Sequence, residues 1–125
     1  MQSISLEKTQ DTPGIILDKE EGVFSFSGIS IPENTKDFYK PIFEWIDNYI
    51  QAPNEETVVS FKMVYFNTSS TKSILDILLR FRGLIKDGKM VIVNWYFQEE
   101  DEDMYEAGVG FSKMTHIPFN YIKME

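Results

Sequence analysis

The fold is decided by the stretch TVVSFKMVYF at residues 57–66 and by the turn NTSSTK that follows it at residues 67–72. The stretch is almost entirely apolar, β-branched or aromatic, which predicts a central strand covered on both faces. Beyond the turn, apolar residues recur at helical spacing and predict a helix from about Thr71 to Lys86. Its predicted buried face comprises Ile74, Ile77, Leu78, Phe81, Leu84 and Ile85. Residues 90–97, MVIVNWYF, repeat the central-strand pattern, so strand, helix and strand alternate as in an α/β fold.

The residues that precede this unit predict β structure. Ile4 and Leu6 alternate with polar residues and indicate a short first strand. Two further strands, Gly14–Asp18 and Val23–Ser27, flank a charged turn and predict a β-hairpin. The second of these strands alternates phenylalanine with serine, which is typical of a strand with one buried face.

A first helix is predicted between the hairpin and the central strand. Residues 30–33, Ser-Ile-Pro-Glu, fit a capping box, in which the serine accepts from a free amide and the glutamate reaches back. The apolar face that follows comprises Phe38, Ile42, Trp45, Ile46 and Tyr49. Pro41 predicts a kink or a break within this helix, and residues 52–54, Ala-Pro-Asn, should end it.

The rest of the chain holds an acidic segment, a short helix predicted near Met104, and a last strand around Asn120–Lys123. The predicted fold is therefore α/β: one domain over residues 1–125, with a mixed β-sheet and two main amphipathic helices packed on it. A chain of 125 residues, 42% of them hydrophobic and 14% aromatic, is long enough for one hydrophobic core and too short for two ordinary domains.

The composition argues against several classes of function. The chain has no cysteine, which excludes disulfides, thiolate metal sites and thiol nucleophiles, and its single histidine, His116, argues against a multi-histidine metal site. Its first ten residues lack the pattern of a signal peptide, and no apolar run reaches the length of a membrane span. We therefore expect a soluble cytoplasmic protein with no membrane insertion, no metal, no cofactor and no catalytic residues.

The net charge of −8 is concentrated in one segment. Six of the eight residues from Glu99 to Glu106 are acidic, and no Lys or Arg occurs between Lys89 and Lys113. A basic footprint for phosphate backbones is absent, so nucleic acid is not an expected partner. The pattern of a calcium loop fails, because Tyr105 stands where a fifth-position ligand is needed. A solvated loop, a surface for a basic partner and a loose cation site are the alternatives for this segment.

The turn from Asn67 to Lys72 contains more polar side chains than a turn needs. Asn, Ser and Thr are preferred helix N-caps, so capping is the simplest interpretation. A cap needs only one such residue, and the surplus predicts exposed hydroxyl groups at the positive end of a helix. A phosphoryl group on Thr68, Ser69 or Ser70 would be tolerated there, because helix N-termini stabilise anions.

Several stretches of the chain agree, in order and spacing, with the pattern of one known family. They are Gly28–Asn34, Phe38–Pro41, Tyr65–Lys72, and Asn94–Tyr96 leading to Asp101–Met104. Together they resemble the SiaC family, the biofilm regulation phosphoproteins, which are similar in fold to STAS-domain anti-sigma factor antagonists. The resemblance extends over nearly the whole chain and therefore implies the fold and the regulatory role of that family.

The resemblance implies a partner-switching module. In the family, a Ser/Thr kinase phosphorylates a threonine in the Asn-Thr-Ser-Ser string, which corresponds to Thr68 here, and a PP2C-type phosphatase removes the phosphate. The unphosphorylated form binds and activates an effector such as a diguanylate cyclase. The other residues of this phosphosite loop are Asn67, Ser69, Ser70, Thr71 and Lys72. Thr71 stands where the family is expected to favour serine, a departure that hardly affects the acceptor.

A partner surface is predicted close to the acceptor. The candidate residues are Leu75, Leu79, Arg82, Asp101 and Asp103. The two leucines lie one helical turn apart, outside the predicted core stripe, and apolar surface beyond what a sheet needs often marks a contact. The alternative is that the C-terminal segment around Phe111 or Phe119 covers the two leucines.

Two other functions compete with the phosphorylation switch. A small enzyme would bind a phosphorylated substrate at the turn Asn67–Lys72 and use Asp101 or Asp103 as a base or metal ligand. A structural interaction domain would use the turn only as a helix cap. The sequence favours the switch, because an enzyme needs a base and an electrophile that converge, and only carboxylates are available.

Overall fold

The computed structural model describes residues 1–125 and contains one six-stranded sheet whose strands lie in chain order, β1 to β6. The strands are β1 Ile4–Leu6, β2 Gly14–Asp18, β3 Val23–Ser30, β4 Glu56–Phe66, β5 Met90–Gln98 and β6 Phe119–Met124. The helices are α1 Thr35–Tyr49, α2 Thr68–Lys86 and α3 Glu102–Thr115. Strands and helices follow one another in the predicted order.

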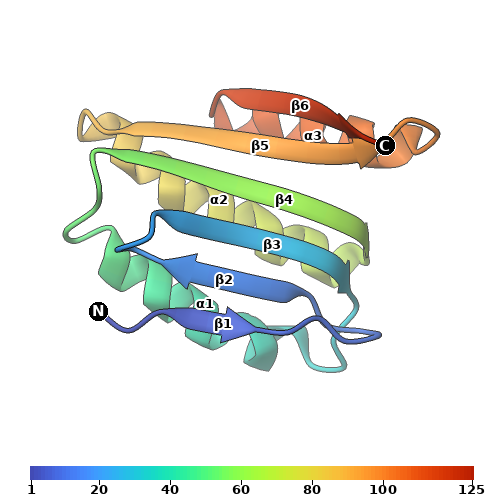
Figure 1. The fold of residues 1–125 in the computed structure, drawn as a ribbon, viewed down its shortest axis with the longest axis horizontal. Coiled ribbons are helices and arrows are strands. Elements are labelled where there is room, and N and C mark those ends of the chain that lie inside the picture. The colour runs from blue at the N-terminus through green and yellow to red at the C-terminus, as the bar shows by residue number, and fades with distance from the viewer.

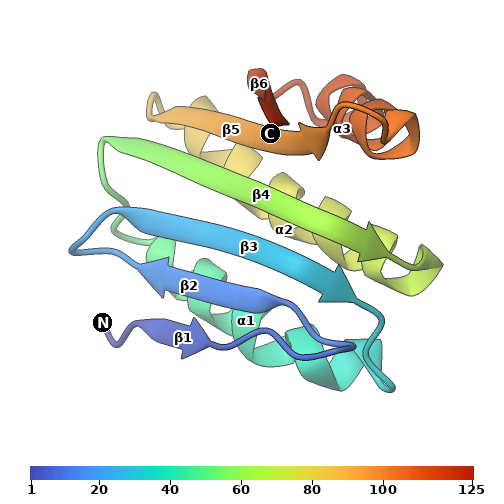
Figure 2. The ribbon, with the colours of Figure 1, turned by 45° about the vertical axis from the view of Figure 1, so that its right-hand side comes forward.

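The sheet is mixed, as predicted. β1, β2 and β3 pair antiparallel, whereas β3, β4, β5 and β6 pair parallel. One helix joins each parallel pair, and the three helices lie behind the sheet in the view of Figure 1 and remain on that face in Figure 2. Crossovers of one hand that step along a sheet in one direction place all their helices on the same face.

The hydrophobic core fills the space between the sheet and the helices. In β4, Val59 and Phe61 face the helices and are fully buried, whereas Ser60 is half-buried and Lys62 is exposed on the opposite face. The prediction that this strand is covered on both faces is therefore wrong. Parallel strands usually have helices on both sides, but here every helix lies on one side and none covers the other.

The first helix begins later than the sequence predicts. Ser30 is the last residue of β3 and pairs with β4, and α1 begins at Thr35. Asn34 is the N-cap, and its side-chain oxygen accepts a hydrogen bond from the Asp37 amide at 3.1 Å. The predicted capping box at residues 30–33 is therefore wrong, because pairing with β4 keeps Ser30 in extended conformation.

The helix α1 runs through Pro41 to Tyr49 without a break, and so ends before residues 52–54. Its predicted apolar face is largely confirmed; the buried residues are Tyr39, Ile42, Trp45, Ile46 and Tyr49. Phe38 packs at the margin of the core. None of the three helices combines the length and the apolar composition that crossing a bilayer requires.

The helix α3 is much longer than the short helix predicted near Met104. Two glycines within it, Gly108 and Gly110, disfavour a helix by local propensity. Gly108 lies against the indole of Trp95, where a Cβ atom would lie 2.5 Å from Cδ1. The Trp95 Nε1–H group also donates to the Met104 carbonyl at 2.9 Å. Contacts with β5 therefore stabilise a helix that the local sequence does not predict.

Candidate functional site

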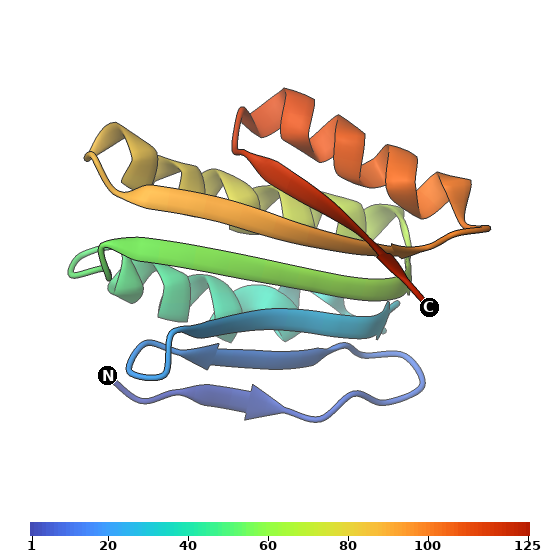
Figure 3. The ribbon, with the colours of Figure 1, turned by 45° about the horizontal axis from the view of Figure 1, so that its top comes forward.

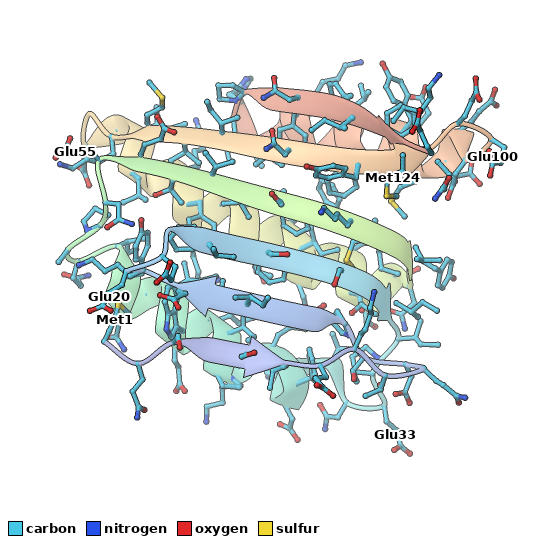
Figure 4. All side chains as sticks on the ribbon, viewed as in Figure 1. Met1, Glu20, Glu33, Glu55, Glu100 and Met124 are labelled. Carbon is cyan, nitrogen blue, oxygen red and sulfur yellow. The ribbon has the colours of Figure 1, made fainter.

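The three helices begin at one end of the sheet, where the parallel strands β3, β4 and β5 end (Figure 3). In Figure 4 the labels Glu33 and Glu100 lie at this end, whereas Glu20 and Glu55 lie at the opposite end. Free amide groups give helix N-termini a partial positive charge. The predicted acceptor turn lies at this end of the sheet, because it joins β4 to α2.

The helix α2 begins at Thr68, earlier than the predicted start at Thr71. Asn67 is the N-cap: its Oδ1 atom accepts from the Ser70 amide at 2.9 Å, and its carbonyl accepts from the Thr71 amide at 2.9 Å. Thr68 is exposed, and its hydroxyl makes no hydrogen bond within the protein. The amide groups of Thr68 and Ser69 are also without a partner, so this helix end is able to accept an anion.

The hydroxyl groups of the turn divide into bonded and free groups. Ser70 is fully buried, and its hydroxyl donates to the Ser30 carbonyl at 2.8 Å. Thr71 Oγ1 donates to a backbone carbonyl one turn earlier at 3.0 Å. Only Thr68 and Ser69 are exposed. The expectation that Ser70 would tolerate a phosphoryl group is therefore wrong, because its hydroxyl is enclosed and hydrogen-bonded.

Three hydroxyl groups form a hydrogen-bonded chain beneath the turn. Tyr39 Oη lies 2.6 Å from Ser30 Oγ, which lies 2.8 Å from Ser70 Oγ. Because a carbonyl only accepts, Ser70 donates to the Ser30 carbonyl; Ser30 must then donate to Ser70, and Tyr39 to Ser30. The chain connects α1, the end of β3 and the first turn of α2. The sequence analysis missed Ser30 and Tyr39, because no local pattern relates either residue to this distant turn.

The hydroxyl chain stays neutral. Burial raises the pKa of Tyr39 above its ordinary value, and the neighbouring hydroxyl groups of Ser30 and Ser70 offset part of this rise. The phenol therefore keeps its proton at neutral pH and remains a donor. No buried side-chain oxygen or nitrogen is left without a partner, so the chain is a fully satisfied network that holds the turn in place.

The predicted partner residues on α2 differ in exposure. Leu75 packs against the core and is half-buried. Leu79 is 41% exposed, and Arg82 is half-buried. At about 3.6 residues per turn, Leu79 and Arg82 follow Thr68 by about three and about four turns. The three side chains therefore occupy the outer face of the helix, and Lys72 on the first turn is exposed near them.

Asp101 and Asp103 belong to the start of α3 and not to the face of α2. Asp101 is the N-cap of α3, and its Oδ1 atom accepts from the Met104 amide at 3.0 Å. Asp103 is exposed in the first turn, where a carboxylate complements the helix dipole. Most of the acidic segment therefore begins a helix, and no three of its carboxylates converge on a cation site. Asp101 and Asp103 lie at the end of the sheet where α2 and α3 begin, whereas Leu79 and Arg82 lie about three and about four turns further along α2. No hydrogen bond joins the two groups.

The sequence is similar to known proteins over almost its full length. Residues 6–124 match the family described as SiaC family regulatory phosphoprotein. An uncharacterized protein of Pseudomonas aeruginosa strain UCBPP-PA14 is 27% identical over 119 residues, which cover 95% of this chain and 94% of that protein.

Two solved structures from Pseudomonas aeruginosa share the fold. Apo-SiaC has a TM-score of 0.88 and 25% identity, with 98% of this chain and 99% of that chain covered. SiaC in the crystal structure of diguanylate cyclase SiaD in complex with its activator SiaC has a TM-score of 0.89 and 26% identity, with 97% and 99% covered. The six-stranded mixed sheet with helices on one face is therefore the fold of these proteins.

Proposed function

The chain belongs to the SiaC family of regulatory phosphoproteins, and from this membership we propose that it is a partner-switching regulator whose phosphoacceptor is Thr68. A Ser/Thr kinase phosphorylates Thr68, a PP2C-type phosphatase removes the phosphate, and the unphosphorylated protein binds and activates a diguanylate cyclase. In this proposal residues 1–125 act as one domain in the cytoplasm, where the kinase has access to ATP. The observation that carries the proposal is the exposed, unbonded hydroxyl of Thr68 at the N-terminus of α2.

The chain is a regulator and not an enzyme, as its family membership and the role of the Pseudomonas aeruginosa activator establish. The rival interpretation as a carboxylate-dependent enzyme is therefore set aside. The geometry of its candidate base agrees, because one oxygen of Asp101 already accepts from the Met104 amide as a helix cap. The effector class is proposed because a diguanylate cyclase is the partner that the SiaC of that complex activates.

Thr68 is favoured over the other hydroxyl groups by position. Ser70 is enclosed, and Thr71 is bonded to the backbone, which leaves Thr68 and Ser69. Successive helical residues are rotated by about 100°, so only one of these two shares the outer face of α2 with Leu79. That residue is Thr68, and a phosphate on it would border the predicted partner surface.

A phosphate on Thr68 would leave the fold intact and change the surface. The helix dipole stabilises a negative group at this position by about 0.3–1 kcal/mol at an exposed site. The phosphate adds a charge of about −1.5 to −2 at pH 7. Placed inside a desolvated contact, such a charge costs about 2–5 kcal/mol, and each 1.4 kcal/mol changes the affinity about tenfold. Local electrostatics is therefore sufficient for the switch, and no refolding is required.

The proposal is tested by substituting the acceptor. Thr68→Glu should weaken binding to the purified cognate diguanylate cyclase by at least about tenfold, while Thr68→Ala binds like the wild type; isothermal titration calorimetry measures both. Ser69→Glu is the matched control and should bind within about threefold of the wild type. Thermal unfolding of all variants should be nearly unchanged, because both side chains are exposed. Equal binding by Thr68→Glu and the wild type would contradict the proposal.

Mass spectrometry tests the acceptor directly. After incubation with cell lysate and ATP, the intact protein should gain one phosphoryl group, and tandem spectra should assign it to Thr68. The variant Thr68→Ala should gain none. Modification chiefly on Ser69 would show that the acceptor is the neighbouring residue.

A further inference from the structure

The strand β4 contains a β-bulge just before the acceptor turn. Gly28 of β3 pairs with Met63, and the next residue, Ile29, pairs with Tyr65, so Val64 is an extra residue in β4. Met63 is buried beneath the helices, whereas Val64 and Tyr65 are 62% and 55% exposed. Bulges redirect side chains and are common beside functional sites. The bulge therefore exposes the large side chains of Val64 and Tyr65 at the end of the sheet where α2 begins.

Val64 and Tyr65 line one side of a groove of about 200 Å³ between the end of β4 and the start of α3, called here the β4–α3 groove. Its other lining residues are Phe66, Asp101, Asp103, Met104 and Ala107. The pairing of β4 with β5 stops at Phe61, so the last part of β4 has no strand partner on that side. Pockets for small molecules measure about 300–1,000 Å³. The groove therefore suits one large apolar side chain better than a small-molecule ligand.

The rim of the β4–α3 groove is acidic. Asp101 uses one carboxylate oxygen to cap α3, and Asp103 forms no salt bridge. Lys123 pairs with Glu99 of the acidic segment at 3.4 Å, and no salt bridge reaches Asp101 or Asp103. Unpaired carboxylates beside an apolar floor complement a segment that carries a cation next to an apolar side chain.

We propose that the β4–α3 groove receives a segment of the effector, which places one large apolar side chain in the groove and a Lys or Arg against Asp103. The inference rests on the proposed function, since it takes the effector to bind beside Thr68. Charge complementarity selects a basic segment. Continuity selects the effector, because a single residue separates Phe66, which lines the groove, from Thr68, so the segment adjoins the acceptor. The Lys or Arg of the segment faces Asp103, and a phosphate on Thr68 still weakens binding where its desolvation costs more than its attraction to that cation contributes.

The test measures binding of the unphosphorylated protein to the purified cognate diguanylate cyclase. Val64→Ser removes apolar surface from the groove and should weaken the affinity about tenfold. Asp103→Asn should weaken the affinity about threefold at low salt and reduce its dependence on salt concentration. The matched controls are Ile16→Ser, at a residue that is 44% exposed on β2, and Glu20→Gln, at the end of the sheet opposite the groove. Both controls should bind like the wild type.

The outcomes separate this inference from the proposed function. If Val64→Ser and Asp103→Asn bind like the wild type while Thr68→Glu remains weakened, the groove inference is overturned and the switch stands. If Ile16→Ser loses as much affinity as Val64→Ser, the groove inference is also overturned. A wild-type protein that does not bind the cyclase overturns both proposals. Val64 and Asp103 are exposed, so thermal unfolding should confirm that their variants fold.

Discussion

Thr68 and Ser70 lie in the same first turn of α2, yet only one of them is available to a modifying enzyme. Thr68 faces solvent, whereas Ser70 faces the core and donates to the Ser30 carbonyl. Each helical residue is rotated by about 100° from the last, so Ser70, four and seven positions before the buried Ile74 and Ile77, lies on the face of α2 that packs on the sheet. Thr68 lies on the opposite face.

The hydroxyl chain beneath the turn predicts the effect of Tyr39→Phe. This change keeps the ring in the core and removes the hydroxyl that donates to Ser30. The free energy of unfolding should fall by about 1 kcal/mol, because one buried hydrogen bond is lost. Urea unfolding at pH 7 measures the difference. Tyr105→Phe is the control, since that tyrosine is exposed, and its stability should stay within about 0.5 kcal/mol of the wild type.

The raised pKa of Tyr39 adds a pH dependence to the same comparison. Its contribution to stability is complete below the unfolded pKa of about 10, and it is lost as the pH rises through the higher folded pKa. Above about pH 10 the wild type should therefore lose stability more steeply than Tyr39→Phe. Parallel loss of stability by the two proteins would contradict this assignment.

At the scale of elements, α3 is held on β5 by two contacts with Trp95, one at Gly108 and one at the Met104 carbonyl. Gly108 packs directly on Trp95, while Gly110, on the same helix, has open space where its Cβ atom would lie. The first position needs glycine because of tertiary packing, and the second does not. The N-terminal turn of α3 also supplies the rim of the β4–α3 groove, so the proposed partner contact depends on the docking of α3 on β5.

The two glycines predict opposite results for the same substitution. Gly108→Ala should lower the free energy of unfolding by about 1–3 kcal/mol, because the new methyl group overlaps the Trp95 indole. Gly110→Ala should leave stability unchanged or raise it by up to about 1 kcal/mol, since alanine favours a helix. Denaturant unfolding measures both. Equal effects of the two substitutions would show that Gly108 is not in tight contact with Trp95.

At the scale of the whole molecule, all three helices cover one face of the sheet and leave the other face to solvent. Stability should therefore be highest in the central strands, which have neighbours on both sides and helices beneath them. The edge strand β1 has only three residues and one neighbour. Thr68, the first residue of α2, is exposed at the end of the sheet where the helices begin, so a group added to it would leave the core contacts intact.

Hydrogen exchange should follow this arrangement. The amide groups of β4 should exchange slowest, because this strand pairs with β3 and β5 and lies over α2. The amide groups of β1 should exchange fastest among the strands. Exchange measured by mass spectrometry at the peptide level is sufficient to compare them. Slower exchange in β1 than in β4 would contradict the arrangement.

Much of the fold follows from local patterns in the sequence. The order of strands and helices, the α/β class and most of the apolar faces of α1 and α2 are predicted correctly. Two details of α2 are wrong: Ile85, predicted as buried, is 38% exposed near the end of the helix, and the helix begins at Thr68 and not at Thr71. The correctly predicted features depend on residues a few positions apart, whose periodicity and hydrogen-bonding capacity the sequence displays directly. The acceptor Thr68 follows from the resemblance to a family, and its role stays a prediction.

The rest was decided by contacts between residues distant in the sequence. The helix crossovers place all three helices on one face of the sheet. Pairing of Ser30 with β4 delays the start of α1, and the packing of Gly108 against Trp95 stabilises the full length of α3. The enclosure of Ser70 and the exposure of Val64 likewise need β3 beside β4. A local pattern carries no record of which distant residue will lie opposite it, so only the tertiary structure separates the available hydroxyl from the buried one.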